Sequence, residues 1–343
     1  QLKCVSTVKQ ALSDANIDVA VFDEVEVEPT DKSFKAGIEF AKSGNSDGFF
    51  SVGGGSSMDT AKAADLYTTH PPHEFLDYVN APIGNAKPVP GPLKPHIACP
   101  TTAGTGSETG RSTVVLNEDT GRKVIITHPG MMPGIVIADP ELTIGLPRVL
   151  TVGTGLDALS HSLEAICSPG HHPMSHGIGM EGCRLVFEHL PSAAANPTDL
   201  EARSQMLTAA AMGAVAFQKG LGAMHALAHP IGAHFDTHHG MTNAVVMPYV
   251  LIANRSAIEA TIERLGAYTG LGHTFDDVLA HIVQLRADLD VPNTLVELGV
   301  DPDAVDTIAT AAVHDPSAGT NPITVDHDFA AAVFAAACEG RLD

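Results

Sequence analysis

Asp157 and His161 have the residue types and the spacing of two ligands to one metal ion. They lie four residues apart in a stretch where Leu156, Leu159 and Leu163 recur with a helical period. Residues four apart on a helix share one face and are separated by one turn. A carboxylate oxygen and an imidazole nitrogen arranged in this way can bind the same ion.

Two later stretches supply further imidazoles. His225 and His229 lie in the first, and the adjacent pair His238 and His239 lies in the second, with residues 231–236 between the stretches. The spacing leaves open which member of the adjacent pair points inward. Three imidazoles and one carboxylate, without thiolates, suit a borderline divalent ion such as iron(II), zinc, cobalt or nickel. A single histidine is more often structural, but histidines set together in apolar helices favour a metal site.

Other polar residues near these stretches are not expected to bind the metal. Glu164, three residues after His161, is either a fifth oxygen ligand or a solvated side chain, and we favour the solvated side chain because carboxylates are rarely buried. A second histidine cluster, made of His171, His172 and His176, lies in a segment marked by proline and glycine, and we expect it at the surface.

A glycine-rich turn forms a second candidate site. Residues 50–60 read Phe-Ser-Val-Gly-Gly-Gly-Ser-Ser-Met-Asp-Thr, which predicts a strand, a tight turn and a helix. Glycines permit close backbone approach, and a helix N-terminus offers free N–H groups to a pyrophosphate. The turn matches neither Gly-x-Gly-x-x-Gly nor Gly-x-x-x-x-Gly-Lys. A second loop, rich in hydroxyls and glycines, spans residues 101–108 after the next strand. Two such loops at the ends of successive strands predict an extended anionic cofactor.

The elements that must position these groups change in character near residue 148. Before it, we expect helices over 3–15, from residue 29 and from about residue 57, strands over 19–22, 48–52, 97–99 and 134–138, and a hairpin of 112–116 with 123–127. Strands alternating with helices predict a parallel sheet with covered faces. After it, helical periodicity prevails, with helices over 156–166, 179–189, 201–217, 257–268 and 329–338.

The bulk composition narrows the classes of protein further. A chain of 343 residues favours two domains, here a dinucleotide-binding α/β domain over 1–147 and an all-helical metal-binding domain over 148–343. With 19 basic and 40 acidic residues, the net charge of −21 argues against nucleic acid or anionic membranes as partners. The five cysteines form no Cys-x-x-Cys pair, so we expect reduced thiols. With no long apolar run and no basic-then-apolar leader, we expect a cytoplasmic protein.

Five motifs together resemble the iron-containing (group III) alcohol dehydrogenase family over essentially the whole chain. They are Gly-Gly-Gly-Ser-Ser-Met-Asp, Pro-Thr-Thr-Ala-Gly-Thr-Gly-Ser-Glu, Gly-Leu-Asp-Ala-Leu-Ser-His, His-Ala-Leu-Ala-His-Pro and His-His-Gly-Met-Thr-Asn-Ala. The resemblance implies a Rossmann-like parallel-sheet N-terminal domain and an all-α C-terminal domain, the architecture also found in 3-dehydroquinate synthase. It implies one divalent metal, iron(II) or an ion such as zinc, together with NAD or NADP, and we expect a homo-oligomer such as a dimer.

The resemblance also implies roles for individual residues. It makes Asp157, His161, His225 and His239 the metal ligands, and gives His229 a place near the nicotinamide where it would assist proton transfer. It makes the remaining matched residues cofactor contacts: Gly54, Gly55, Ser56, Asp59, Thr101, Thr102, Thr105 and Lys123. Asn243 and Pro248 fit the family pattern as structural residues.

Two regions of the chain resemble different branches of the family. Residues 22–110 are similar to hydroxyacid-oxoacid transhydrogenase, whereas residues 219–250 are closer to ordinary bacterial alcohol dehydrogenases. The first strands of the family pattern are absent from the sequence, including the acidic residue that usually selects the adenosine ribose. The choice between NAD and NADP therefore stays open.

The expected activity is reversible hydride transfer between a small alcohol or aldehyde and a nicotinamide. Between residues 156 and 249 the only basic residues are Arg184, Arg203 and Lys219, and none lies in a ligand motif. A dicarboxylate would need a positioned cation, so the alternative reaction, hydroxyacid-oxoacid transhydrogenation with 4-hydroxybutyrate and 2-oxoglutarate, is less favoured. A lyase like 3-dehydroquinate synthase would need more cations still. A non-catalytic metal-binding remnant, suggested by the absent strands, would bind metal but no cofactor.

Overall fold

The computed structural model describes residues 3–81 and 83–342. The chain forms two compact units. The first comprises residues up to 102 and residues 107–143, and the second comprises residues 103–106 and those from 144 onward. Each unit has its own hydrophobic core. Among the helices that the structure describes, none has both the length and the apolar character required to cross a membrane.

A parallel sheet lies in the first unit. It has the order β1 (Phe49–Gly53), β2 (His96–Pro100) and β5 (Ile135–Val136). Phe49 pairs with His96, and the register continues to Gly53 opposite Pro100. The strand expected over 134–138 is shorter than predicted, because only Ile135 and Val136 pair with β2. The strand expected over 19–22 is wrong, because in the described chain this apolar run has no neighbouring strand to complete a ladder.

A separate two-stranded sheet and three α-helices complete the described part of the first unit. The expected hairpin is confirmed, with β3 (Ser112–Asn117) antiparallel to β4 (Arg122–Thr127). The helices are α1 (Lys3–Asp14), α2 (Asp31–Ser43) and α3 (Gly55–Thr69), with short 3-10 turns at Phe75–Asp77, Ser107–Thr109, Pro129–Met131 and Pro140–Thr143. A capping box between Thr30 and Ser33 explains why α2 begins where it does. The unit's core includes Phe34, Leu66 and Ile126.

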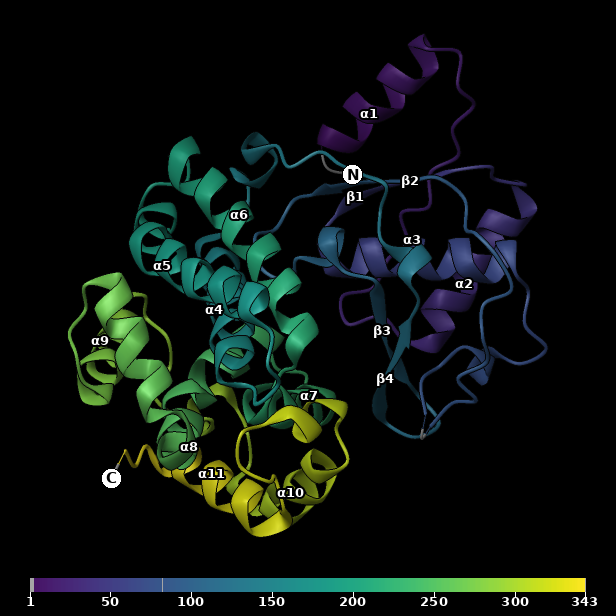
Figure 1. Ribbon diagram of the computed structural model, residues 1–343. Helices are drawn as coiled ribbons and strands as arrows, with labels where there is room; N and C mark the ends of the chain where they lie inside the picture. Colours follow the sequence, from purple (N-terminus) through teal and green to yellow (C-terminus); the bar gives the residue numbers. More distant parts are fainter. Residues whose placement is uncertain (1–2, 82, 343) are drawn as a thin grey trace. The chain divides into compact units, whose positions relative to one another are not determined.

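The second unit is helical throughout its described residues. Its helices are α4 (Arg148–Cys167), α5 (Pro173–Ala195), α6 (Leu200–Ala216), α7 (Ala223–Phe235), α8 (His239–Thr269), α9 (Phe275–Asp288), α10 (Val305–Val313) and α11 (His327–Glu339). Short 3-10 turns lie at Phe217–Lys219, Val296–Leu298, Pro302–Ala304 and Pro316–Thr320. All five helices expected after residue 148 are confirmed. Helix α4 packs against α5, α6 and α8, as Figure 1 shows, and Leu156, Leu159 and Leu163 are fully buried.

Glycines allow the helices of the second unit to approach closely around α4. A Cβ atom on Gly240, at the start of α8, would lie 2.2 Å from the carbonyl oxygen of Gly153 and 3.0 Å from Cβ of Asp157. A Cβ atom on Gly213 of α6 would lie 3.0 Å from Cβ of His161. Any side chain at Gly240 would therefore push the start of α8 away from α4.

The substitution Gly240→Ala should destabilise the second unit. A Cβ atom 2.2 Å from a backbone oxygen forces the two helices apart, which typically costs about 1–3 kcal/mol. Denaturant unfolding measures the loss. The matched control is Gly177→Ala in α5, where an added Cβ would meet nothing within 4 Å and should raise helix stability slightly. Equal stabilities for the Gly240 variant and the wild type would contradict the close approach.

His96 should make the stability of the first unit depend on pH. Its Nε2 lies 2.8 Å from Ser51 Oγ between β1 and β2, and burial, aided by the charge of Lys62, lowers the pKa of His96 from 6.5 to about 4. Between these two values the unfolded chain binds the extra proton, so stability falls as the pH drops from 6.5 towards 4. The substitution His96→Gln should reduce this loss by up to roughly 3 kcal/mol in denaturant unfolding at several pH values. The exposed His73→Gln should leave it unchanged, and a parallel decline in all three proteins would refute the prediction.

Candidate metal centre

One carboxylate oxygen, Oδ1 of Asp157, lies close to three imidazole nitrogens. Its distance to Nε2 is 3.5 Å for His239, 3.8 Å for His225 and 4.0 Å for His161. The ligand atoms of Asp157, His225 and His239 all lie within 4.8 Å of one another. The separations of 3.5–4.0 Å between the imidazole nitrogens and Asp157 Oδ1 are within the span that two bonds of about 2.0–2.2 Å to one ion can bridge.

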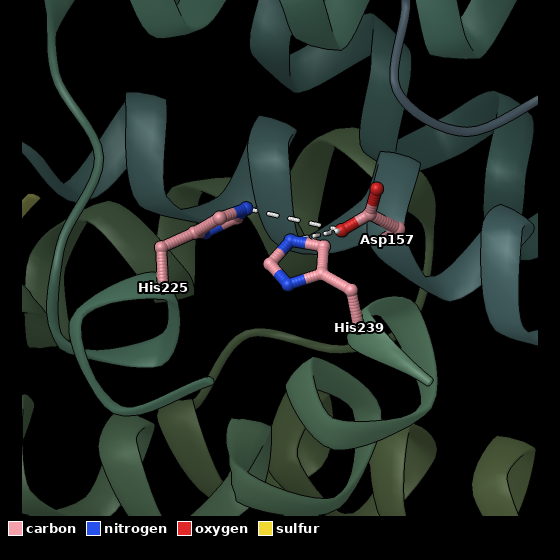
Figure 2. A group of neighbouring side chains, drawn as sticks. All are labelled: Asp157, His225 and His239. Carbon is pink, nitrogen blue, oxygen red and sulfur yellow. Dashed lines mark ion pairs between the residues drawn. The ribbon is translucent and has the colours of Figure 1, made fainter. Parts of the chain in front are cut away.

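Three helices deliver these side chains. Asp157 and His161 are one turn apart on α4, His225 lies in the first turn of α7, and His239 is the first residue of α8. Figure 2 shows the rings of His225 and His239 reaching towards the Asp157 carboxylate from separate parts of the chain. The ring of His161 stacks on that of His225, with centroids 4.8 Å apart. The structure thus brings three of the four predicted ligands, Asp157, His225 and His239, together within the second unit, and places His161 beside them.

The adjacent histidines at the start of α8 have different places. Nδ1 of His238 accepts a hydrogen bond from the backbone N–H of Met241, so His238 caps the helix, and its side chain is exposed. His239 instead faces Asp157. The geometry agrees with the choice of His239 that the family resemblance implied.

Glu164 is buried, so the expectation of a solvated side chain is wrong. Its Oε2 accepts a hydrogen bond from Nδ1 of His225 at 2.7 Å, and its Oε1 accepts from the backbone N–H of Met224 at 2.6 Å. With the proton on Nδ1, the lone pair of His225 is on Nε2, facing Asp157. The sequence contained a signal for this position, because Glu164 lies seven residues after Asp157 and therefore on the same face of α4.

Asp315 is a second residue that the sequence reasoning missed. Its Oδ2 lies 2.8 Å from Nδ1 of His229, and its Oδ1 accepts from the backbone N–H of Ser317. Burial opposes ionisation, but the charge and hydrogen bond of His229 lower the pKa of Asp315. The ring of His229 stacks on that of His239, with centroids 5.2 Å apart. No local pattern links two residues 86 positions apart, so only the fold could reveal this pair.

The electrostatics of the group favour a cation. Asp157, Glu164 and Asp315 are carboxylates in a buried region, and within the described chain none of them forms a salt bridge with lysine or arginine. Burial lowers the pKa of His161 to about 4, which leaves it neutral at pH 7. Although burial acts against protonation of His225, Glu164 and Asp157 raise its pKa overall. Buried negative charge of this kind requires compensation, and neutral imidazole lone pairs are the donors that a divalent ion needs.

Asn243 adds a further indication of an ion at this point. Its Nδ2 donates to Asp157 Oδ1 at 3.0 Å and lies 3.3 Å from Nε2 of His225 and 3.2 Å from Nε2 of His239. Three acceptors therefore compete for one amide group, whose own Oδ1 is buried and has no hydrogen-bond partner. A divalent ion accepts all three lone pairs at once, so these residues fit such an ion.

The glycine-rich turn lies in the first unit, with Gly54 as N-cap of α3 and Gly55 and Ser56 in its first turn. A Cβ atom on Gly54 would lie 3.2 Å from Oγ1 of Thr102, so the turn and the second loop face each other closely. The N–H of Thr101 donates to the Gly53 carbonyl. Thr105 belongs to the second unit.

The two charged residues predicted to contact the cofactor have partners within the first unit. The Asp59 carboxylate accepts from Ser107 Oγ at 2.7 Å and from the Val114 N–H at 2.9 Å. Burial raises the pKa of Asp59, with the charge of Lys62 acting against it. Lys123 forms an ion pair with Glu28. Their role towards a cofactor stays a prediction.

Comparison with known proteins agrees with this arrangement. Residues 1–140 match the model of iron-containing alcohol dehydrogenase, and residues 151–338 match that of the Fe-containing alcohol dehydrogenase family, C-terminal. The chain is 37% identical to 4-hydroxybutyrate dehydrogenase of Cupriavidus necator, over 89% of this chain and 81% of that protein. It is 36% identical to the mitochondrial hydroxyacid-oxoacid transhydrogenase of Bos taurus, over 87% and 73%.

A solved structure extends the likeness to the fold. The crystal structure of a 1,3-propanediol oxidoreductase aligns with a TM-score of 0.92 and 33% identity, covering 98% of this chain and 89% of that one. The α/β unit, the helical unit and the family motifs thus all lead to one conclusion. The chain belongs to the iron-containing alcohol dehydrogenase family and is an oxidoreductase that acts on CH–OH groups.

Proposed function

We propose that this chain is a metal-dependent, NAD(P)-linked dehydrogenase that interconverts a small alcohol and its aldehyde. The observation that carries the proposal is the convergence of three imidazole Nε2 atoms on Asp157 Oδ1. Asp157, His161, His225 and His239 would hold one divalent ion, iron(II) or another ion such as zinc. Bound there, the ion would supply Lewis-acid polarisation of the alcohol oxygen, and the nicotinamide would supply the hydride acceptor.

The first unit would hold the dinucleotide. The backbone N–H groups of Gly55 and Ser56, at the start of a 15-residue helix, suit the negative charge of a pyrophosphate. The close approach of Gly54 to Thr102 supports a cradle made by both loops. We assign Asp59 and Thr101, which belong to the same unit, to this cradle and Lys123 to the ribose. Both NAD and NADP remain candidates.

His229 would move the proton that the alcohol loses. Asp315 accepts from Nδ1 of His229, which leaves Nε2 as the atom that takes up and passes on a proton. The stacking of His229 on His239 keeps this nitrogen beside the proposed metal ligands.

The three basic residues between 156 and 249 support an uncharged substrate. Arg203 donates to the Pro197 carbonyl and to Thr151 Oγ1, and Lys219 donates to the carbonyls of Ala165 and Ser168. Arg184 pairs with carboxylates of its own helix. The three basic residues between 156 and 249 are therefore engaged in holding the fold, so none of them is available for a substrate carboxylate.

Hydroxyacid-oxoacid transhydrogenation is the second candidate, because of the identity to the Bos taurus enzyme of that name. The two activities separate in one assay. An alcohol dehydrogenase needs added NAD or NADP for each turnover, whereas a transhydrogenase converts 4-hydroxybutyrate and 2-oxoglutarate without free nicotinamide.

Replacing a proposed ligand should remove both metal and activity. His239→Ala deletes one of four donors, so the purified protein should lose most of its bound iron or zinc, and oxidation of short alcohols with NAD or NADP should fall at least about 100-fold. Metal analysis and steady-state kinetics measure both. The control is the adjacent His238→Asn, which keeps a helix cap and should retain metal and activity. Full metal content in the His239 variant would refute the proposed centre.

Replacing the proposed proton carrier should affect turnover but not metal content. His229→Gln removes the group that takes up the proton and should lower kcat by about 10²–10⁴-fold. Asp315→Asn should give a smaller loss, since it disturbs only the orientation of His229. His234→Gln, an exposed residue of the same helix, serves as control. An unchanged kcat in the His229 variant would exclude this role.

A further inference from the structure

We propose that Glu164 is a positioning residue that holds His225 and the start of α7 in place for the metal, and that this role requires both of its carboxylate oxygens. The inference rests on the metal centre proposed above and concerns a residue outside the four ligands. It identifies the group that connects the ligand helix α4 to the ligand helix α7.

The first part of the role is at the N-terminus of α7. The first N–H groups of a helix have no partner within the helix, and the N-cap here is Gly222, which has no side chain to supply one. Glu164 Oε1 accepts from the N–H of Met224, and Oδ1 of Asn321 accepts from the N–H of Ala223 at 3.0 Å. A Cβ atom on Gly222 would lie 3.1 Å from Glu164 Oε1 and 2.7 Å from Asn321 Oδ1. The glycine thus leaves room for both acceptors.

The second part is at the imidazole one residue further on. Glu164 Oε2 accepts from Nδ1 of His225, which fixes the ring orientation and leaves the Nε2 lone pair facing Asp157 Oδ1, 3.8 Å away. A carboxylate is the only natural side chain of this length with two acceptor atoms and no donor. It can therefore satisfy Met224 and His225 together.

Glutamine in the same place can satisfy only one of these two donors. If its oxygen accepts from the Met224 N–H, its amide hydrogens face Nδ1 of His225 and favour the tautomer with the proton on Nε2, which cannot bind a metal. If its oxygen accepts from His225, its amide group faces the Met224 N–H and the helix end loses a partner. Loss of a partner that orients a metal-binding histidine typically weakens metal affinity about 10–100-fold.

The test is metal affinity of the full chain, measured without any substrate. The metal-free wild type and Glu164→Gln are titrated with zinc in competition with a chelator, and we expect the dissociation constant to rise about 10–100-fold in the variant. Asn321→Ala is the matched control, because it removes the other partner of the same helix end but touches no imidazole. It should lower the thermal midpoint and leave the dissociation constant within about threefold of wild type.

Each other outcome overturns a distinct statement. Wild-type affinity in Glu164→Gln, or an equal loss of affinity in Asn321→Ala, would overturn the positioning role. A wild type that binds no divalent ion would overturn the metal centre itself. Should Glu164→Gln fail to fold, ¹⁵N NMR of the histidines in the zinc-loaded wild type still decides, since a proton on Nδ1 of His225 supports the inference and metal bound through Nδ1 refutes it.

Discussion

The second unit is organised around a buried carboxylate that is surrounded by imidazoles. Asp157 lies on the most enclosed helix of the unit, and no lysine or arginine in the described chain pairs with it. Burying an ionised carboxylate is costly unless a compensating charge is close. A divalent ion at the proposed centre would supply this charge and link the three helices, so we infer that metal binding stabilises the packing of α4, α7 and α8.

The sequence predicted the parts of this centre that depend on local spacing. Because Asp157 and His161 are four residues apart, helical geometry places them one turn apart on the same face, and both residues do lie on the helix α4. The glycine-rich turn was placed between a strand and a helix for the same kind of reason, and α3 begins there. The choice between His238 and His239 needed the family resemblance, because adjacent residues at the start of a helix differ only in direction.

The parts that escaped prediction depend on contacts between distant segments. Asp315 meets His229 across 86 residues, and no pattern in the sequence joins them. The prediction of a solvated Glu164 relied on the general rarity of buried carboxylates. That generalisation does not apply here, because each carboxylate oxygen of Glu164 accepts a hydrogen bond in the interior. The run over residues 19–22 has the composition of a strand, but a strand exists only with a neighbour, and composition does not reveal whether one is present.

The glycines at the helix contacts around α4 limit which positions can accept larger side chains. Gly153, Gly213 and Gly240 lie where neighbouring helices come within contact of the segments that carry Asp157 and His161. Larger residues there would displace the segments that carry Asp157 and His161. We therefore expect that substitutions which alter substrate preference are tolerated elsewhere in the chain and not at these three glycines.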